Sequence, residues 1–238
     1  MTQKTSPAAA AAPSRIPQAP TQRTRALLAC GVVAGPLFVV VAVLQMVTRD
    51  GFDPSQHPLS LLSNGDLGWV QITNFVVAGL LFVAAALGMR RFRHSGPGGS
   101  WGPWLIGALG LALIWGGLFV ADPADGFPPG TPAGRPDQLS WHGMLHAVGP
   151  MVGYLAPLVA CFVLARRFRR FGQPRWATYC TTTGVVSPLI VIAAFPAGDF
   201  RLLFAGGVLL WGWASVVAAH LLSEEVATQP PEAQPHTP

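Results

Sequence analysis

Six long apolar segments alternate with polar loops along the chain. Each is about the 20 residues that an α-helix needs to cross the hydrocarbon core of a bilayer. Every backbone N–H and C=O group in lipid must be paired within its own segment, so segments of this kind must be helical. The pattern predicts an all-α polytopic membrane protein with six transmembrane helices in one bundle, at about residues 26–47, 70–89, 102–121, 142–165, 176–196 and 201–222.

The chain ends have a different composition from the apolar segments. Residues 1–25 and 223–238 are rich in small and polar residues and proline, without an apolar period, which predicts disordered tails. A secretory signal is the alternative for residues 1–47. The apolar segment there is longer than the usual signal core and no small-residue cleavage site follows it, which favours a retained first helix.

Charge gives the predicted bundle an orientation. Only 11% of the residues are charged, compared with about 25% in soluble domains. Of the 15 Lys and Arg residues, 12 lie in the N-terminal tail, the second loop and the fourth loop, all on one side of a six-helix bundle. The positive-inside rule then predicts a multi-pass protein of the cell membrane with both termini on the cytoplasmic side. The basic residues behind the net charge of +5 are therefore expected to interact with membrane lipids, and no nucleic-acid partner is expected.

Polar residues gather in the first outer loop and at the adjoining helix. His57 and Ser60 lie in a loop whose leucines would let it pack down as a short interfacial helix. Asn74 follows about one turn inside the second predicted helix. Its amide could bond to a neighbouring helix or point into a polar cavity.

The second outer loop carries the remaining candidate chemistry. Asp122 and Asp125 leave the third helix at its outer boundary, and the loop returns to His142 and His146. Two residues four apart project from one face of a helix. This histidine pair therefore faces the same side of the predicted fourth helix.

A histidine pair at this spacing can chelate one metal ion. With Asp122 as third ligand, His142 and His146 would hold a zinc ion that keeps an open position for water, and a second carboxylate, Asp125, could act as general base. Asp125, His57 and Asp199 are alternative third ligands. Competing interpretations are a structural hydrogen-bond network and a proton-linked or ligand-binding site.

Several of these residues form an ordered pattern that resembles the domain-of-unknown-function 998 family. The matching motifs are Gly35-Pro36, His57-Pro-Leu-Ser60, Gly68-Trp69-Val-Gln71-x-x-Asn74, Asp122-Pro-x-x-Gly126 and His142-Gly-x-x-His146. The resemblance covers roughly residues 26–222 and implies a six-helix integral membrane protein, without supplying an activity.

A looser similarity is to the membrane hydrolases that include alkaline ceramidases. Those enzymes use a serine, an aspartate and several histidines around zinc, and this chain offers Ser60 as the corresponding catalytic serine. It departs from them in helix number and motif order.

The function expected from these patterns is binding of a lipid or small amphiphile through a polar pocket on the outer face. One alternative is a metal-dependent hydrolase acting on a lipid at the outer leaflet, and another is a small-molecule transporter. The predicted pocket residues are His57, Ser60, Asn74, Asp122, Asp125, His142 and His146.

Overall fold

The computed structural model describes residues 22–91 and 101–227 of the chain. Six helices in this part are long and apolar enough to cross a membrane, which confirms the predicted all-α membrane class. The spans are α1 (Gln22–Thr48), α2 (Gly68–Arg91), α3 (Trp101–Leu118), α4 with α5 (Trp141–His146 and Val148–Arg170), α6 (Pro174–Ala197) and α7 (Phe200–Ala227).

The first and last helices begin earlier and end later than the apolar pattern predicts. Residues 22–25 and 223–227, predicted as parts of disordered tails, are helical. Arg25 of α1 and Glu225 of α7, which lie in these added turns, attract each other electrostatically. The other tail residues, 1–21 and 228–238, lie outside the described part of the chain.

The fourth span is divided into α4 and α5, whereas the sequence predicts a single helix. The division falls at Ala147. Pro150 explains it, since a proline has no N–H to donate and its ring crowds the carbonyl four residues earlier, which here belongs to His146.

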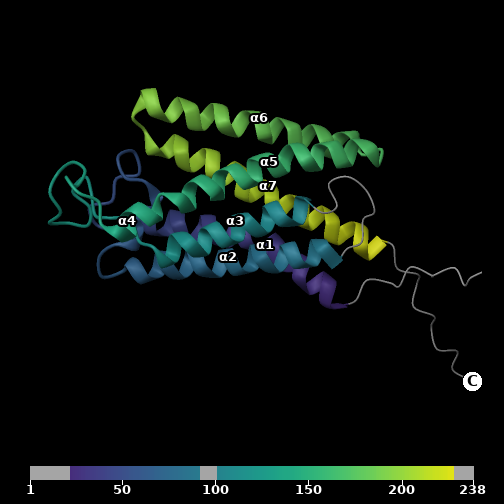
Figure 1. Ribbon diagram of the computed structural model, residues 1–238, viewed down its shortest axis with the longest axis horizontal. Helices are drawn as coiled ribbons and strands as arrows, with labels where there is room; N and C mark the ends of the chain where they lie inside the picture. The colour runs from purple at the N-terminus through teal and green to yellow at the C-terminus, as the bar shows by residue number, and fades with distance from the viewer. Residues whose placement is uncertain (1–21, 92–100, 228–238) are drawn as a thin grey trace, which may run out of the picture.

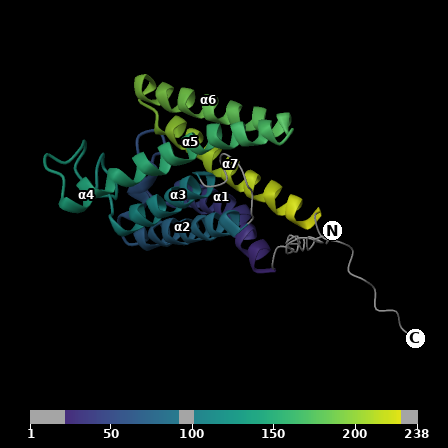
Figure 2. The ribbon, with the colours of Figure 1, turned by 45° about the vertical axis from the view of Figure 1, so that its right-hand side comes forward.

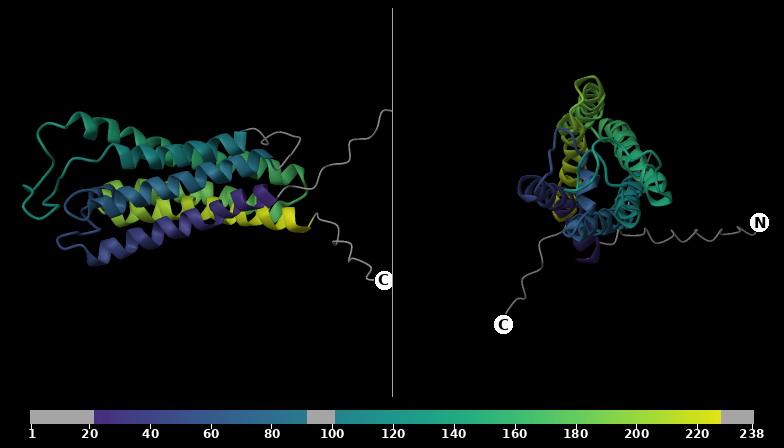
Figure 3. Two further views of the ribbon diagram at one scale, coloured as in Figure 1. Left: turned by 90° about the horizontal axis from the view of Figure 1, so that it is seen from below. Right: turned by 90° about the vertical axis from the view of Figure 1, so that its left-hand side faces the viewer.

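The spans form a closed ring in which each helix packs mainly against two neighbours, and α5 also touches α7 (Figure 3). Around the ring the order is α1, α2, α3, α5, α6 and α7, and α7 returns to α1. The first three helices and the last three make two halves that run along the long axis of the molecule (Figures 1 and 2). Residues 49–67 and 119–140 gather at one end, here termed the long-loop face; α1 begins and α7 ends at the other, the termini face.

The interior of the ring is filled by one hydrophobic core with members from all six spans. Phe38, Phe82 and Trp213 are among its largest fully buried side chains. Apolar residues such as Val40 and Leu80 cover the outside of the ring instead. Helices that are apolar on every side are typical of membrane spans, in which one face packs on protein and another on lipid.

Candidate functional site

The two loops of the long-loop face fold into a cap over the helix ends. The first loop contains η1 (Leu59–Ser63), the short helix that its leucines predicted. A small hydrophobic core separate from that of the bundle holds the two loops together. Its members are Phe52, Leu61, Leu62 and Phe127.

Arg49, at the start of the first loop, contacts residues of both loops of the cap. Its guanidinium donates hydrogen bonds to the carbonyls of Leu62, at 3.1 Å, and Asn64, at 2.7 Å. Its central carbon lies 5.3 Å from the centre of the Phe127 ring. Burial lowers the pKa of Arg49, and the attraction of Asp66 opposes that shift.

His57 is a buried structural residue of the cap, with 5% of its surface exposed. Its Nδ1 accepts from the Asp53 N–H at 2.9 Å, so Nε2 carries the proton and donates to the Asp125 carbonyl at 2.9 Å. Both ring nitrogens are therefore used. His57 is not placed to ligate a metal or to activate Ser60, which lies half-buried in η1.

Asp125 enters these contacts through its backbone. Besides accepting from His57, it donates its N–H to the Gly134 carbonyl at 2.8 Å. Its φ of 53° lies in the left-handed region, which an aspartate tolerates better than most side chains. Asp125, which the sequence suggested as a general base, thus shapes a turn of the second loop through its backbone.

Asn74 bonds to a neighbouring helix, the first of its two predicted alternatives. Its side-chain nitrogen donates to the Phe38 carbonyl of α1 at 3.1 Å and to Gln71 Oε1 at 3.3 Å. Gln71 Oε1 also accepts from Gln45 of α1 at 2.6 Å. All three amides are buried, and they join α1 to α2 beneath the cap.

Asp122 stabilises the start of α4. Its carboxylate accepts from the Ser140 N–H at 2.8 Å and from the Ser140 hydroxyl at 2.5 Å. The same hydroxyl accepts from the Gly143 N–H at 3.0 Å, which makes Ser140 the N-cap of α4. Asp122 thus closes the second loop onto the helix that follows it.

The two histidines of the predicted metal pair lie in different environments. His142 is exposed, and its ring centre is 3.6 Å from that of Trp141. His146 is buried, with 6% exposed, and its Nδ1 donates to the Phe119 carbonyl at 2.6 Å. The shared helical face was inferred from spacing alone, and the structure exposes one ring of the pair and buries the other.

The residues proposed as zinc ligands therefore do not form a converging set. Within residues 22–91 and 101–227, no three His, Cys, Asp or Glu side chains are grouped so that they could hold a metal ion. Asp122 is engaged by Ser140, and Asp199, an alternative ligand, is paired with Arg201 at 2.7 Å. Local hydrogen bonding accounts for the predicted donors better than metal chemistry does.

Hydrogen bonds also set the charge state of the acids in the loops. The Ser55 hydroxyl and backbone N–H, with the Gln56 amide, lower the pKa of Asp53 to about 2. Hydrogen bonds from Arg201 lower the pKa of Asp199. Both carboxylates are ionised at neutral pH and act as acceptors that shape their loops.

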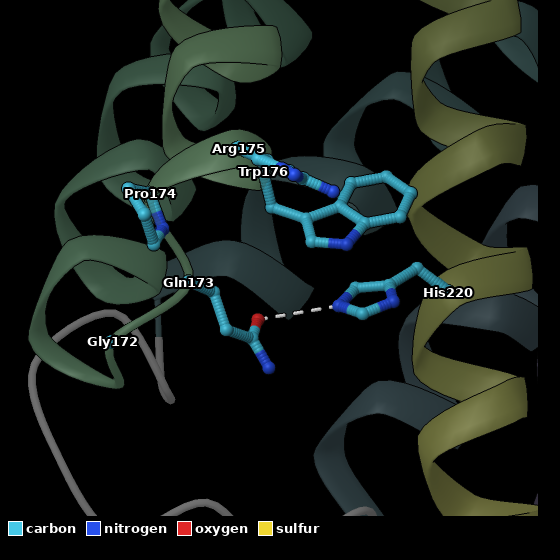
Figure 4. A pocket seen from close by; sticks show the side chains of 6 residues that line it. All are labelled: Gly172, Gln173, Pro174, Arg175, Trp176 and His220. Atoms are coloured by element: carbon cyan, nitrogen blue, oxygen red, sulfur yellow. Dashed lines mark hydrogen bonds between the residues drawn. The ribbon is translucent and has the colours of Figure 1, made fainter.

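A cavity of about 310 Å³ opens at the termini face, away from all the predicted site residues (Figure 4). Residues 172–176 and His220 line it. The His220 ring stacks on the Trp176 indole, with centres 3.9 Å apart and planes 15° from parallel. His220 Nε2 lies 3.2 Å from Gln173 Oε1 and 3.4 Å from a Glu224 carboxylate oxygen.

A second cavity, a groove of about 360 Å³, follows the seam between α1 and α7. Val32 and Gly35 of α1 lie along it, as do residues of α7 from Val208 to Ala219. The helices approach closely at Gly35, whose N–H donates to the Ser215 hydroxyl at 3.0 Å. A Cβ added at Gly212 would meet nothing within 4 Å, so the missing side chain there leaves part of the groove open.

Neither cavity was anticipated from the sequence. Gln173 and His220 are 47 residues apart, so their contact has no local signal. A histidine inside an apolar span was the available clue to the first cavity. The groove arises from glycines in α1 and α7. These helices are far apart in the sequence, and the pattern of residues along the chain does not show that they pack together.

The comparisons with known proteins agree with this architecture. A family model described as "Protein of unknown function (DUF998)" matches residues 32–222. The chain belongs to the DUF998 family. The match to DUF998 begins in α1 and ends in α7, so it contains the cap, the cavity and the groove.

The DUF998 match confirms the resemblance drawn from the sequence motifs. No curated protein and no solved structure matches the chain. The family description specifies no activity, so a function for this DUF998 chain has to be argued from its own geometry.

Proposed function

We propose that this multi-pass membrane protein binds a membrane lipid, or an amphiphile of similar shape, without catalysing a reaction. The groove between α1 and α7 carries the proposal. Its volume of about 360 Å³ lies in the range of about 300–1,000 Å³ that is usual for ligand sites. The lipid is expected to lay one acyl chain along the groove.

The surroundings of the groove support an acyl chain as the occupant. Its lining is almost entirely apolar, and Ser215, the polar residue in it, already has Gly35 as a partner. Val33 and Val216 beside the groove are exposed on the outside of the ring, where lipid surrounds the protein. Chains of bilayer lipid can therefore enter from the side.

The long-loop face supports binding over catalysis. The residues proposed there for chemistry, such as His57 and Asp122, are committed to hydrogen bonds that hold loops and helix ends.

The proposal includes an orientation in the cell membrane. Nine described arginines lie at the termini face, compared with three at the long-loop face. By the positive-inside rule, the termini face is assigned to the cytoplasm. The termini-face arginines are Arg23, Arg25, Arg90, Arg91, Arg166, Arg167, Arg169, Arg170 and Arg175.

Filling the groove tests the proposal. Gly212→Leu should place its side chain in the open part of the groove and displace an acyl segment. Each heavy-atom contact contributes about 0.1–0.2 kcal/mol, so losing about ten contacts should weaken lipid binding about tenfold. Native mass spectrometry of the purified chain, titrated with dioleoyl phosphatidylcholine, measures the affinity.

The matched control is Ala193→Leu, which adds the same side chain at an exposed position of α6 away from the groove. It should leave lipid affinity unchanged. Equal affinities for the Gly212 variant and the control would show that the groove does not hold the lipid.

A further inference from the structure

The termini-face cavity lies at one end of the lipid groove. Ala219 lines the groove, and the next residue of α7, His220, lines the cavity. Successive helix residues rise by only about 1.5 Å. Each residue also turns the helix by about 100°, so Ala219 faces the groove beside α1 whereas His220 faces Trp176 of α6. The groove and the cavity therefore end at nearly the same depth on adjoining sides of α7, and a lipid whose acyl chain follows α7 from Val208 to Ala219 would reach the cavity with its polar part across the outer surface of α7.

The neighbourhood of the cavity is strongly basic. Residues 166–175, from the last turns of α5 through the connection to the start of α6, contain five arginines and no acidic residue. Arg175 lines the cavity, and Arg166, Arg169 and Arg170 are exposed close by in the chain. Neither ion pair found among the described residues involves any of these four arginines.

The acid next to the cavity, Glu224, is already engaged. It accepts a hydrogen bond from the Gln173 amide and lies 3.4 Å from His220 Nε2. Buried Arg167 also attracts it. The charge of Glu224 is therefore offset locally, and Arg175 leaves the cavity with a net attraction for anions.

The polar groups available in the cavity suit a phosphate. An arginine guanidinium provides paired donors that match phosphate oxygens. The side chain of Gln173, the N-cap of α6, does not cap the helix, so the N–H groups of Arg175 and Trp176, which follow Pro174, add to the attraction. The Trp176 indole, stacked on His220, gives the cavity an amphipathic wall of the kind found where headgroups meet hydrocarbon.

We infer that the cavity binds the phosphate of an anionic phospholipid, such as phosphatidylglycerol, whose acyl chain occupies the groove between α1 and α7. This inference rests on the proposed function, because the groove supplies the binding of the chain. The cavity adds selection among headgroups. The occupant is a lipid of the leaflet at the termini face, and Arg175 is the main contact of its phosphate.

Two lipids with identical chains test the headgroup separately from the chain. The full-length protein in detergent is titrated with dioleoyl phosphatidylglycerol or dioleoyl phosphatidylcholine and followed by native mass spectrometry. The wild type should prefer phosphatidylglycerol. Arg175→Gln should weaken phosphatidylglycerol binding about fivefold, the effect of one cationic side chain near a membrane surface, and leave phosphatidylcholine binding unchanged.

Arg91→Gln is the matched control, since Arg91 is an exposed arginine at the same face that does not line the cavity. Equal losses of phosphatidylglycerol binding in the two arginine variants would overturn the inference and assign the preference to general surface charge. Equal wild-type affinities for the two lipids would also overturn it. Displacement of phosphatidylglycerol by glycerol phosphate would replace the lipid with a soluble ligand and overturn it as well.

The groove and the headgroup site fail in distinguishable ways. If Gly212→Leu leaves both lipids bound while Arg175→Gln removes the preference, the chain site in the proposed function is wrong and the phosphate site remains. If Gly212→Leu weakens both lipids equally and Arg175→Gln has no effect, the groove stands and the phosphate site is wrong.

Discussion

The long-loop face and the termini face are both rich in polar residues, but their side chains differ in what remains available. At the long-loop face, His57 and Asp122 have their polar atoms paired within or between the two loops. At the termini face, Arg175 lies on a cavity in neither of the ion pairs among the described residues. The side chains of His57 and Asp122 therefore build structure, whereas the guanidinium of Arg175 is available to bind a ligand.

This difference follows from what each face must do. Long loops over a membrane-embedded bundle have many backbone groups to satisfy, and unpaired polar groups are costly when buried. Side chains such as Asp122 supply those bonds. The turn between α5 and α6 is only residues 171–173, so Arg170 and Arg175 beside it have few loop groups to bond and stay exposed.

The largest expected effect comes from breaking the cap at its core. Phe127 is fully buried, so Phe127→Ala should destabilise the cap by about 3–5 kcal/mol, the usual cost of removing a buried phenylalanine. Limited proteolysis of the two long loops measures the opening. Lipid binding at the termini face should remain within about twofold, because mutations at distant sites are close to additive.

Phe195→Ala is the control for that variant, since Phe195 is an aromatic residue of α6 with 76% of its surface exposed. Its loops should resist protease as the wild type does. If Phe127→Ala abolishes lipid binding, the two faces are coupled and their separation is wrong.

The membrane class could be predicted from the sequence because lipid restricts the structures that span it. The order of helices around the ring could not. Phe38 is fully buried and Val40 is exposed to lipid, yet both are apolar residues of one helix. Where lipid and core are equally apolar, hydropathy does not identify the face of a helix that packs inward.

The candidate site was harder to predict for another reason. His142 and His146 have the spacing of a chelating pair, but His142 is exposed whereas His146 is buried with its Nδ1 bonded to the Phe119 carbonyl. His57 and Asp125, by contrast, are 68 residues apart and bonded. The spacing of two residues predicts whether they are neighbours on one helix. Contacts between loops depend on backbone groups, which every residue has and which therefore leave no pattern in the sequence.

An intermediate effect is expected from the histidines of α4. His146→Ala removes a buried hydrogen bond and should cost about 1–3 kcal/mol. His142→Ala removes an exposed side chain and should stay within about 0.5 kcal/mol. Thermal unfolding, followed by a thiol-reactive dye that reaches the buried Cys161 and Cys180 only after unfolding, measures both.

A shared metal would give a different result for the same pair of variants. Both substitutions would then cost stability equally, and a chelator such as EDTA would lower the wild type to the level of the variants. We expect EDTA to leave the wild type unchanged, because no three His, Cys, Asp or Glu side chains among the described residues are grouped so that they could hold a metal ion.

The smallest expected effect is the acid response of the first loop. Hydrogen bonds hold the pKa of Asp53 at about 2, below its usual value of 3.8. A carboxylate with a depressed pKa stabilises the folded loop above its usual pKa, and that contribution is lost as the pH falls from about 4 towards 2. Hydrogen exchange of residues 53–57, corrected for the intrinsic effect of pH, should therefore accelerate over this range.

Asp53→Asn should remove that acid response and accelerate exchange at neutral pH by no more than about fivefold, because contacts of an exposed carboxylate are weak. Asp50→Asn, at an exposed carboxylate of the same loop, should keep the wild-type response. If acid accelerates exchange equally in both variants, the acid response of the cap comes from groups other than the Asp53 carboxylate.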